Sequence, residues 1–391
     1  MAATKAFSSD QPYDKSVLGL GLQGGAAHGA FTWGVLDRLL EEDDLEIGAI
    51  TGASSGAFNT ALIAHGVCQG DRALAQRTLR EGWMALSEAA ANLPASLGAP
   101  ISPFRSLEFP VLTPFGLTTY NYDKMMGTWP DLSHWMHQMY MGNYHGIPQG
   151  VYDVQGSNPI LDIVDQLVDF DAIRRSPIDV YVNAINGRTQ KHTVFTGSAL
   201  TAEAVAASAN LRYMMAPVTI NGDEYWDGGY LYNPYFEPLA NHNRRVTDIK
   251  AVMVNPVDQE EAFTNAARAE QRLNGSVFSA GAYENLANIA RTDELLRDFD
   301  RATGREVDGL ELMHRRMIHI HRTQMLVSAS LGSSSKFNLD PDFLEMLHDD
   351  GYAAEDRWLA AHKHELGRRS TFDAKEFARA TYLGLEDGPS T

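Results

Sequence analysis

One short segment combines a serine with the small residues that an exposed nucleophile needs. Gly52-Ala-Ser54-Ser-Gly56 follows a short apolar run and precedes a helical pattern. Glycine on both sides allows a serine to lie on a sharp turn between a strand and a helix, where its hydroxyl is exposed and the helix N-terminus stabilises a nearby oxyanion. We therefore predict that Ser54 is a nucleophile. Ser55 does not fit the spacing and is expected to begin the helix.

A second glycine-rich segment lies between the first predicted strand and the first predicted helix. Its residues are Gly24, Gly25, Ala26, Ala27, His28 and Gly29. Consecutive small residues let backbone N–H groups turn toward an anion, and acyl transfer needs such donors at the oxyanion. We predict an oxyanion hole, with a phosphate-binding loop or a simple tight turn as alternatives. The segment lacks both the G-x-G-x-x-G register and the Gly-Lys-Ser/Thr of a P-loop, which disfavours the phosphate-binding loop.

A carboxylate is the third candidate group. Asp227 precedes Gly228 and Gly229 at the end of a predicted hairpin. Glycine after the acid frees the backbone, so the carboxylate can act as general base to a serine hydroxyl within hydrogen-bond reach. Taken alone, an Asp-Gly pair is most often a turn.

The elements that carry these motifs alternate between strand and helix. The segments 16–22 and 46–50 predict buried strands, while 30–42 and the residues from 57 onward have helical spacing. This alternation predicts a mainly parallel sheet with helices on its faces. Further along, we expect helices at 71–90, 158–173 and 201–209, a hairpin at 178–196, a second hairpin at 218–226, and a strand at 248–254.

Composition narrows the class of protein. The chain has 391 residues, 44% of them hydrophobic, which excludes a disordered chain. Asp and Glu outnumber Lys and Arg by 50 to 32, and the net charge of −18 argues against a nucleic-acid partner. The single cysteine, Cys68, cannot form a disulfide framework. Since no His-Glu-x-x-His pattern occurs, we expect no metal site and no other cofactor.

The sequence also suggests where the protein works. Its first residues contain no apolar h-region, so we expect no secretory signal. No run reaches the roughly 18 apolar residues of a spanning helix. We therefore expect a cytoplasmic protein, with any contact to a membrane or lipid surface being transient and peripheral.

Three parts of the chain differ in character. Residues 1–15 are polar and are expected to form a flexible arm. Residues 91–155 mix Pro and Gly with many aromatic residues and methionines, without a sustained period. Such a segment predicts a lid-like insertion that lines an apolar pocket, with core packing or a homo-oligomer interface as the alternative. Residues 257–391 are expected to be mainly helical, with a strand-like piece at 317–320, and to pack on the catalytic part.

Three segments, taken in their order along the chain, resemble the motifs of the patatin-like phospholipases. They are the glycine-rich loop, the Gly-x-Ser-x-Gly segment and the Asp-Gly-Gly segment. The resemblance covers about residues 16–256 and includes Asn233-Pro234 after the third motif. It implies an α/β fold of the three-layer α/β/α sandwich type with a mainly parallel central sheet. It also implies lipid acyl esters as substrates and chemistry without a metal.

The resemblance further implies roles for individual residues. Ser54 and Asp227 would form a catalytic dyad that needs no histidine. The oxyanion N–H groups would come from Gly24, Gly25 and Ala26. The family usually has Arg or Lys where this chain has His28, and a neutral histidine there favours a neutral ester as substrate. The family's usual Gly-Thr-Ser-Ala-Gly is here Gly-Ala-Ser-Ser-Gly, so both glycines and the serine are kept.

These observations predict a serine acyl-ester hydrolase of the phospholipase A, lipase or esterase type that forms an acyl-enzyme. A short-chain carboxylesterase or an acyltransferase on the same dyad is the alternative, as is a lipid-binding protein with a vestigial site. An ordinary α/β-hydrolase triad is disfavoured, because only two predicted strands precede Ser54.

Overall fold

The structure is a computed structural model, and it describes most of the chain. The described residues are 16–91, 108–113, 116–121, 158–210, 218–241, 245–255, 266–303, 318–326, 331 and 333–383. The expected N-terminal arm and most of the expected insertion at 91–155 lie outside these residues. Within the insertion, an antiparallel hairpin of β3 (Glu108–Thr113) and β4 (Gly116–Asn121) is described.

A mainly parallel sheet forms the centre of the molecule. The eight strands that the described residues contribute to it are β1 (Val17–Leu22), β2 (Glu46–Gly52), β5 (Asp179–Asn186), β6 (His192–Phe195), β7 (Val218–Ile220), β8 (Asp223–Asp227), β9 (Asp248–Met253) and β10 (His319–Gln324). Their order is β10-β9-β1-β2-β5-β8-β7, with β6 also beside β5. The pairs from β10 to β5 are parallel. The pairs β5–β6, β5–β8 and β7–β8 are antiparallel.

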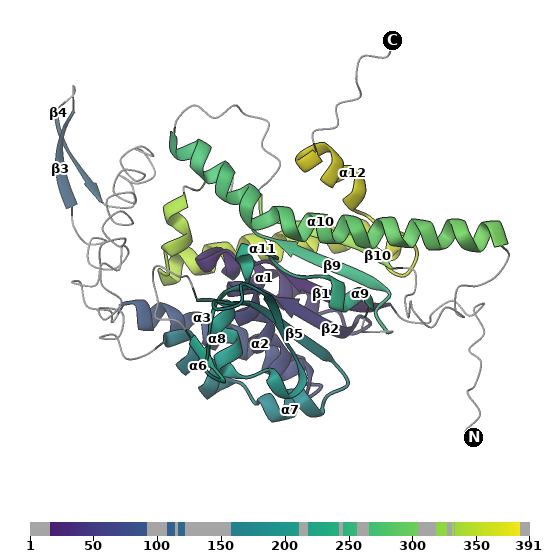
Figure 1. Cartoon of the computed structure of the whole chain (residues 1–391). Coiled ribbons are helices and arrows are strands. Elements are labelled where there is room, and N and C mark those ends of the chain that lie inside the picture. The colour runs from purple at the N-terminus through teal and green to yellow at the C-terminus, as the bar shows by residue number, and fades with distance from the viewer. Residues whose placement is uncertain are drawn as a thin grey trace, which may run out of the picture.

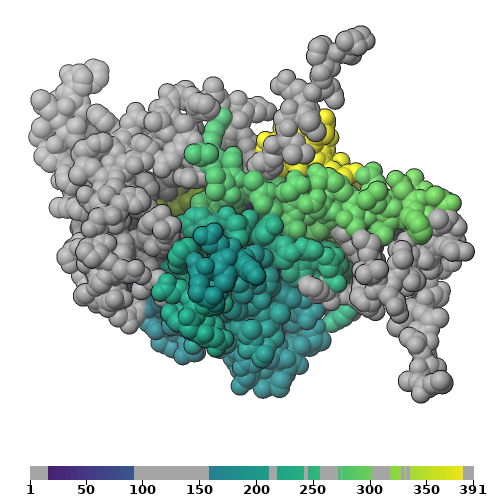
Figure 2. Space-filling view, viewed as in Figure 1, coloured from purple at the N-terminus to yellow at the C-terminus, as the bar shows by residue number. Residues whose placement is uncertain are grey.

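Helices cover both faces of this sheet (Figure 1). They are α1 (Gly29–Leu40), α2 (Ser55–Val67), α3 (Arg72–Ala91), α6 (Pro159–Leu167), α7 (Phe170–Arg175), α8 (Ala202–Ser208), α9 (Glu237–Asn241), α10 (Ala266–Thr303), α11 (Pro341–His362) and α12 (Ala374–Ala378). Short turns are η1 (Ala26–His28), η4 (Gly197–Ala199), η5 (Gly228–Tyr230), η8 (Ser333–Phe337), η9 (Lys363–Glu365) and the π-helical η10 (Arg379–Leu383). The long helix α10 crosses the surface as a green band (Figure 2). The predicted three-layer α/β/α sandwich is confirmed.

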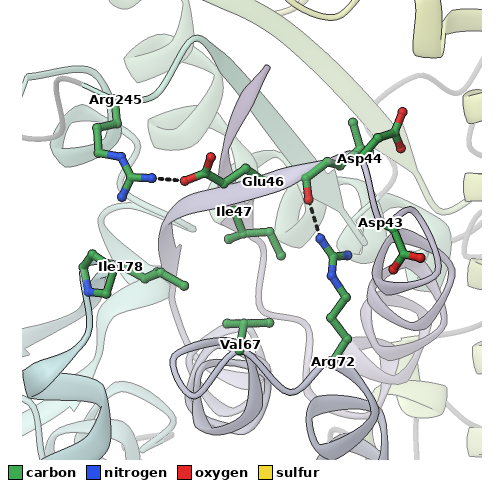
Figure 3. A pocket seen from close by; sticks show the side chains of 11 residues that line it. Asp43, Asp44, Glu46, Ile47, Val67, Arg72, Ile178 and Arg245 are labelled. Carbon is green, nitrogen blue, oxygen red and sulfur yellow. Dashed lines mark hydrogen bonds and ion pairs between the residues drawn. The ribbon is translucent and has the colours of Figure 1, made fainter. Parts of the chain in front are cut away.

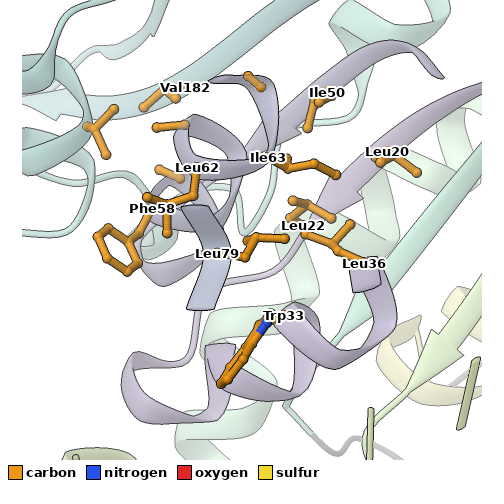
Figure 4. Close-up of a cluster of buried hydrophobic side chains, with 14 of the residues drawn as sticks. Leu20, Leu22, Trp33, Leu36, Ile50, Phe58, Leu62, Ile63, Leu79 and Val182 are labelled. Carbon is orange, nitrogen blue, oxygen red and sulfur yellow. The ribbon is translucent and has the colours of Figure 1, made fainter. Parts of the chain in front are cut away.

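Two hydrophobic cores separate the three layers because side chains alternate across the strands. Leu20 and Leu22 of β1 point into the larger core, where they meet Leu36 of α1 and the helix α2 (Figure 4). The intervening Gly21 faces the other core, and a Cβ atom there would lie 2.0 Å from the ring of Phe236. Glycine in β1 therefore lets the chain before α9 pack directly onto the sheet.

The C-terminal part of the chain is built into both the sheet and a helical layer. Strand β10 extends the sheet beside β9, and α11 packs along α1. A buried ion pair joins the two parts, with Lys250 Nζ 2.9 Å from Glu355 Oε1 and side chains only 1% and 0% exposed. The sheet therefore continues past residue 256, where we expected the catalytic part to end.

The predicted helix at 158–173 is two helices. Val168 and Asp169 have extended backbones between α6 and α7, and the Asp169 side chain accepts a hydrogen bond of 2.8 Å from the N–H of Ala172. Asp169 is thus an N-cap that starts a new helix. In the described ranges, every helix is too short or too polar to span a bilayer.

Candidate active site

Ser54 lies on a strained turn between β2 and α2. Its φ of 57° and ψ of −130° are unusual for a residue with a side chain and cost on the order of 1–3 kcal/mol. Two glycines make the turn possible by close approach. A Cβ atom at Gly52 would lie 2.3 Å from the Gly56 carbonyl oxygen, and one at Gly56 would lie 2.0 Å from that of Leu22. The sharp turn leaves Ser54 half-buried at the carboxyl edge of the sheet.

Two further side chains hold this turn in place. The Ser54 N–H donates a hydrogen bond of 3.0 Å to Ser208 Oγ. The Ser208 hydroxyl donates in turn to the Asn183 carbonyl oxygen at 2.7 Å. The strained backbone at Ser54 is thereby tied to β5 and to the end of α8. Ser208 and Asn183 could not be predicted from the sequence, because no local pattern marks a contact between residues so far apart in the chain.

The sheet register brings Asp227 level with Ser54. Gly52 in β2 lies beside Val182 in β5, and Asp227 in β8 lies beside Ala184 on the other side of β5. Ser54 is two residues beyond Gly52, just as Ala184 is two residues beyond Val182. The two candidate residues therefore lie at the same level of the sheet, on opposite sides of β5. The Ser54 side chain lies close enough to the Asp227 carboxylate to lower the pKa of that carboxyl.

Asp227 is buried, with only 1% of its surface exposed. Its Oδ1 accepts a hydrogen bond of 2.7 Å from the Gly229 N–H. Burial disfavours the charged form and raises the pKa of Asp227 from 3.8 to about 6, against the opposing effects of the nearby Ser54 hydroxyl and the Gly229 N–H. Gly228 is needed for close packing, since a Cβ atom there would lie 2.0 Å from the Asn183 carbonyl oxygen. The carboxylate can thus accept a proton near neutral pH.

The glycine-rich loop lies directly against the serine turn. A Cβ atom at Gly24 would be 2.4 Å from Ser54 Cβ. The N–H groups of Gly24 and Gly25 already have acceptors, because Gly24 donates to Asn233 Oδ1 at 2.7 Å and Gly25 donates to Ser55 Oγ at 2.9 Å. Asn233 also donates to the Gly24 carbonyl oxygen at 2.9 Å, so it fixes the loop from both sides.

The next two amides of the loop differ from these. Ala26 has a φ of 53° and begins the turn η1. Within the described part of the chain, neither the Ala26 N–H nor the Ala27 N–H has a hydrogen-bond acceptor. The sequence predicts Gly24, Gly25 and Ala26 as donors and gives no sign of Ala27. The Ala27 N–H is a candidate donor because the N–H groups of Gly24 and Gly25 already bond to Asn233 and Ser55 in the structure.

His28 is buried and neutral. It is 2% exposed, and its Nε2 lies 2.8 Å from Ser335 Oγ in the turn η8. Burial, and then the nearby charge of Lys336, lower the pKa of His28 to about 3. Gly29 lets η1 approach α2, because a Cβ atom there would lie 2.6 Å from Ser55 Oγ. His28 therefore carries no charge beside the loop.

A comparison of the sequence with known families matches the family model of patatin-like phospholipases over residues 20–240, which is more than half of the chain. The chain belongs to the patatin-like phospholipase family. A comparison with curated proteins finds no match.

Solved structures give distant likenesses to this patatin-like chain. VipD from Legionella pneumophila is 14% identical with a TM-score of 0.39, and the match covers 94% of this chain and 74% of that one. The type III effector protein ExoU is 14% identical with a TM-score of 0.30, over 90% of this chain and 54% of that one. This chain thus spans about half the length of that ExoU chain. A complex of ExoU with SpcU from Pseudomonas aeruginosa is 14% identical with a TM-score of 0.24, over 96% and 67% of the two chains.

A separate hollow of about 300 Å³ lies at the opposite edge of the sheet. Glu46 and Ile47, which begin β2, line it together with Arg72 and Arg245, and Arg245 is ion-paired with Glu46 (Figure 3). Ligands of open α/β sheets bind at the carboxyl ends of the strands, where Ser54 lies. This patatin-like fold therefore has its chemistry-bearing residues away from the hollow.

Metal ligands are not grouped in the part of the chain described here. In those ranges, no three histidine, cysteine, aspartate or glutamate side chains lie close enough together to hold a metal ion. His348, for example, contacts Asp37 and Asp349 in a pairwise network on the surface of α1 and α11.

Proposed function

We propose that this member of the family is a serine acyl-ester hydrolase that uses a Ser54–Asp227 dyad on lipid esters. One observation carries the proposal: the Ser54 hydroxyl on the strained turn lies beside the buried carboxylate of Asp227, whose pKa is raised to about 6. A buried base of this kind is matched to proton transfer near neutral pH.

In the proposed reaction, Ser54 Oγ attacks the acyl carbonyl carbon while Asp227 takes the hydroxyl proton. The negative oxygen that forms is stabilised by the N–H groups of Ala26 and Ala27 and by the N-terminus of α2. The ester oxygen leaves with the proton from Asp227, and the acyl group stays on Ser54. Asp227 then takes a proton from water, whose oxygen attacks the acyl carbonyl carbon. The bond between this carbon and Ser54 Oγ breaks, Ser54 Oγ takes the proton back from Asp227, and the carboxylic acid leaves.

The remaining loop amides have a supporting role in this proposal. Gly24 and Gly25 keep their bonds to Asn233 and Ser55, and those bonds hold the loop against the nucleophile. A preorganised loop does not have to rearrange as charge develops on the substrate oxygen. The lid-like role proposed for residues 91–155 would add an apolar wall for the acyl chain.

Hydrolysis of p-nitrophenyl esters from acetate to palmitate tests the dyad, with a chelator present throughout. We expect Ser54→Ala and Asp227→Asn to lower kcat/KM by at least about 10²–10⁴-fold. Asp223→Asn is the matched control, because Asp223 is in the same strand but is ion-paired with Arg188 on the surface. Its activity should equal that of the wild type. Retained activity in Ser54→Ala would refute the nucleophile assignment.

The chain-length profile of the same assay separates the alternatives. A preference for long acyl chains supports a lipase or phospholipase, and a preference for acetate supports a short-chain carboxylesterase. Transfer of the acyl group to an added alcohol in place of water supports an acyltransferase. Lipid binding that survives Ser54→Ala, together with no wild-type turnover, would instead support a binding protein.

A further inference from the structure

Lys336, from the C-terminal part of the chain, lies beside the glycine-rich loop and has no counter-charge among the described residues. Lys336 is in the turn η8 and is half-buried. No carboxylate in the described ranges pairs with its ammonium. Burial lowers the pKa of Lys336 to about 8, and no neighbouring acid offsets this effect. Partly buried cations are normally paired, so Lys336 can bind an anionic group of a ligand.

The contacts of Lys336 place it at the glycine-rich loop. Its Nζ donates a hydrogen bond of 2.6 Å to Asn255 Oδ1. Asn255 Nδ2 donates to the Gly24 carbonyl oxygen at 3.1 Å. The same Oδ1 atom would lie 3.8 Å from a Cβ atom at Gly25. A single side chain thus links the ammonium to the loop that packs on Ser54.

Neighbouring groups on the same turn fix the lysine there. The adjacent Ser335 contacts His28 at 2.8 Å, which docks η8 onto η1. The ring of Phe278 in α10 lies 6.0 Å from Lys336 Nζ and gives it an apolar neighbour. His28 is neutral, so Lys336 is the charge that this corner of the site presents.

We propose that Lys336 binds the phosphate of a phospholipid substrate while Ser54 attacks one of its acyl esters, and that it makes phospholipids better substrates than neutral esters. This inference rests on the proposed function. In a glycerophospholipid the phosphate and the acyl esters share one glycerol unit, so the two groups must lie within a few bonds of each other. An ammonium beside the oxyanion loop suits that spacing, and a charge-assisted bond to phosphate is strong. His28 alone favoured a neutral ester as substrate, whereas Lys336 favours an ester whose headgroup contains a phosphate.

Two monomeric substrates with the same acyl chains test this role. They are dihexanoyl phosphatidylcholine and dihexanoylglycerol, and neither has a net charge that would attract the protein from a distance. We expect Lys336→Met to lower kcat/KM for the phospholipid about tenfold or more, as expected for one lost charge-assisted bond, and to change the value for dihexanoylglycerol less than about twofold. Lys336→Arg should restore most of the phospholipid activity. Lys191→Met is the control, because it removes an exposed lysine from the turn between β5 and β6.

An equal loss on both substrates would overturn the proposal, since it would show that Lys336 only supports the loop. A binding measurement keeps this outcome separate from failure of the proposed function. Calorimetric titration with the ether analogues of the two lipids, which cannot be hydrolysed, needs no turnover. Wild type should bind the phosphate-containing ether about tenfold more tightly than Lys336→Met does. Equal affinities would refute the phosphate site even if the protein hydrolysed no ester.

Discussion

Replacing Asp227 by asparagine removes a buried charge and keeps the shape of the side chain. Asn Oδ1 can still accept the 2.7 Å bond from the Gly229 N–H, and its amide can donate to the Ser54 oxygen. The substitution therefore leaves the packing and the local hydrogen bonds in place. Its main effect on the free energy of unfolding should come from the lost charge.

The magnitude follows from the pKa of this carboxyl. Burial raises it from 3.8 to about 6, so the folded protein binds more protons than the unfolded chain between these values and loses stability as the pH rises through them. The Asp227 carboxyl therefore lowers the free energy of unfolding by about 3 kcal/mol at pH 7, about 1.5 kcal/mol at pH 5 and about 0.5 kcal/mol at pH 4. Asp227→Asn should be more stable than the wild type by about these amounts.

Urea unfolding of both proteins at these three pH values measures the difference. The gain in stability should shrink as the pH falls, while hydrolytic activity is lost at every pH. Asp223→Asn is again the control, because Arg188 lowers the pKa of Asp223 and its removal should bring no gain at neutral pH. A variant that is no more stable than the wild type at pH 7 would refute the reasoning that burial dominates at Asp227.

Further predictions concern the same base, the turn and the core. Since Asp227 must be ionised to accept a proton, wild-type kcat/KM should fall about tenfold per unit below about pH 6; a flat profile down to pH 4 would contradict this. Ser54→Gly should unfold at a higher urea concentration than Ser54→Ala, because only glycine adopts a φ of 57° with this ψ at little cost; equal midpoints would show that the turn is unstrained. Glu355→Gln leaves the Lys250 ammonium buried without its counter-charge. Urea unfolding should show a loss of about 3–5 kcal/mol in the free energy of unfolding, and the double variant with Lys250→Met should recover much of this loss.

The first half of the fold could be predicted from the sequence because its signals are local. Strands β1 and β2 have short apolar runs, and small residues after each run allow the sharp turns that precede α1 and α2. The break between α6 and α7 also had a local signal in Asp169, which the helical spacing of the flanking residues concealed. The pairing of β10 with β9 had no such signal, because the strand that pairs with a given strand depends on packing across the whole domain.

The candidate site also contains residues that have a local signal in the sequence and residues that have none. Ser54 stands out because it lies between Gly52 and Gly56, and Asp227 stands out because Gly228 and Gly229 follow it. Asn233 and Ser55, which accept the hydrogen bonds of the Gly24 and Gly25 N–H groups, have no local signal in the sequence. The formation of the sheet brings them to the loop. Lys336 was hidden for the same reason: its place beside the loop depends on how the C-terminal part packs against η1.

Covalent labelling of the nucleophile tests the central claim most directly. The wild-type protein is incubated with a long-chain alkyl fluorophosphonate, and the site of the adduct is located by mass spectrometry of its peptides. Our account predicts one adduct on Ser54 and none on Ser55, no adduct in Ser54→Ala, and much slower labelling in Asp227→Asn. An adduct on another residue, or labelling that persists unchanged in Ser54→Ala, would contradict the assignment of Ser54 and Asp227 as the catalytic pair.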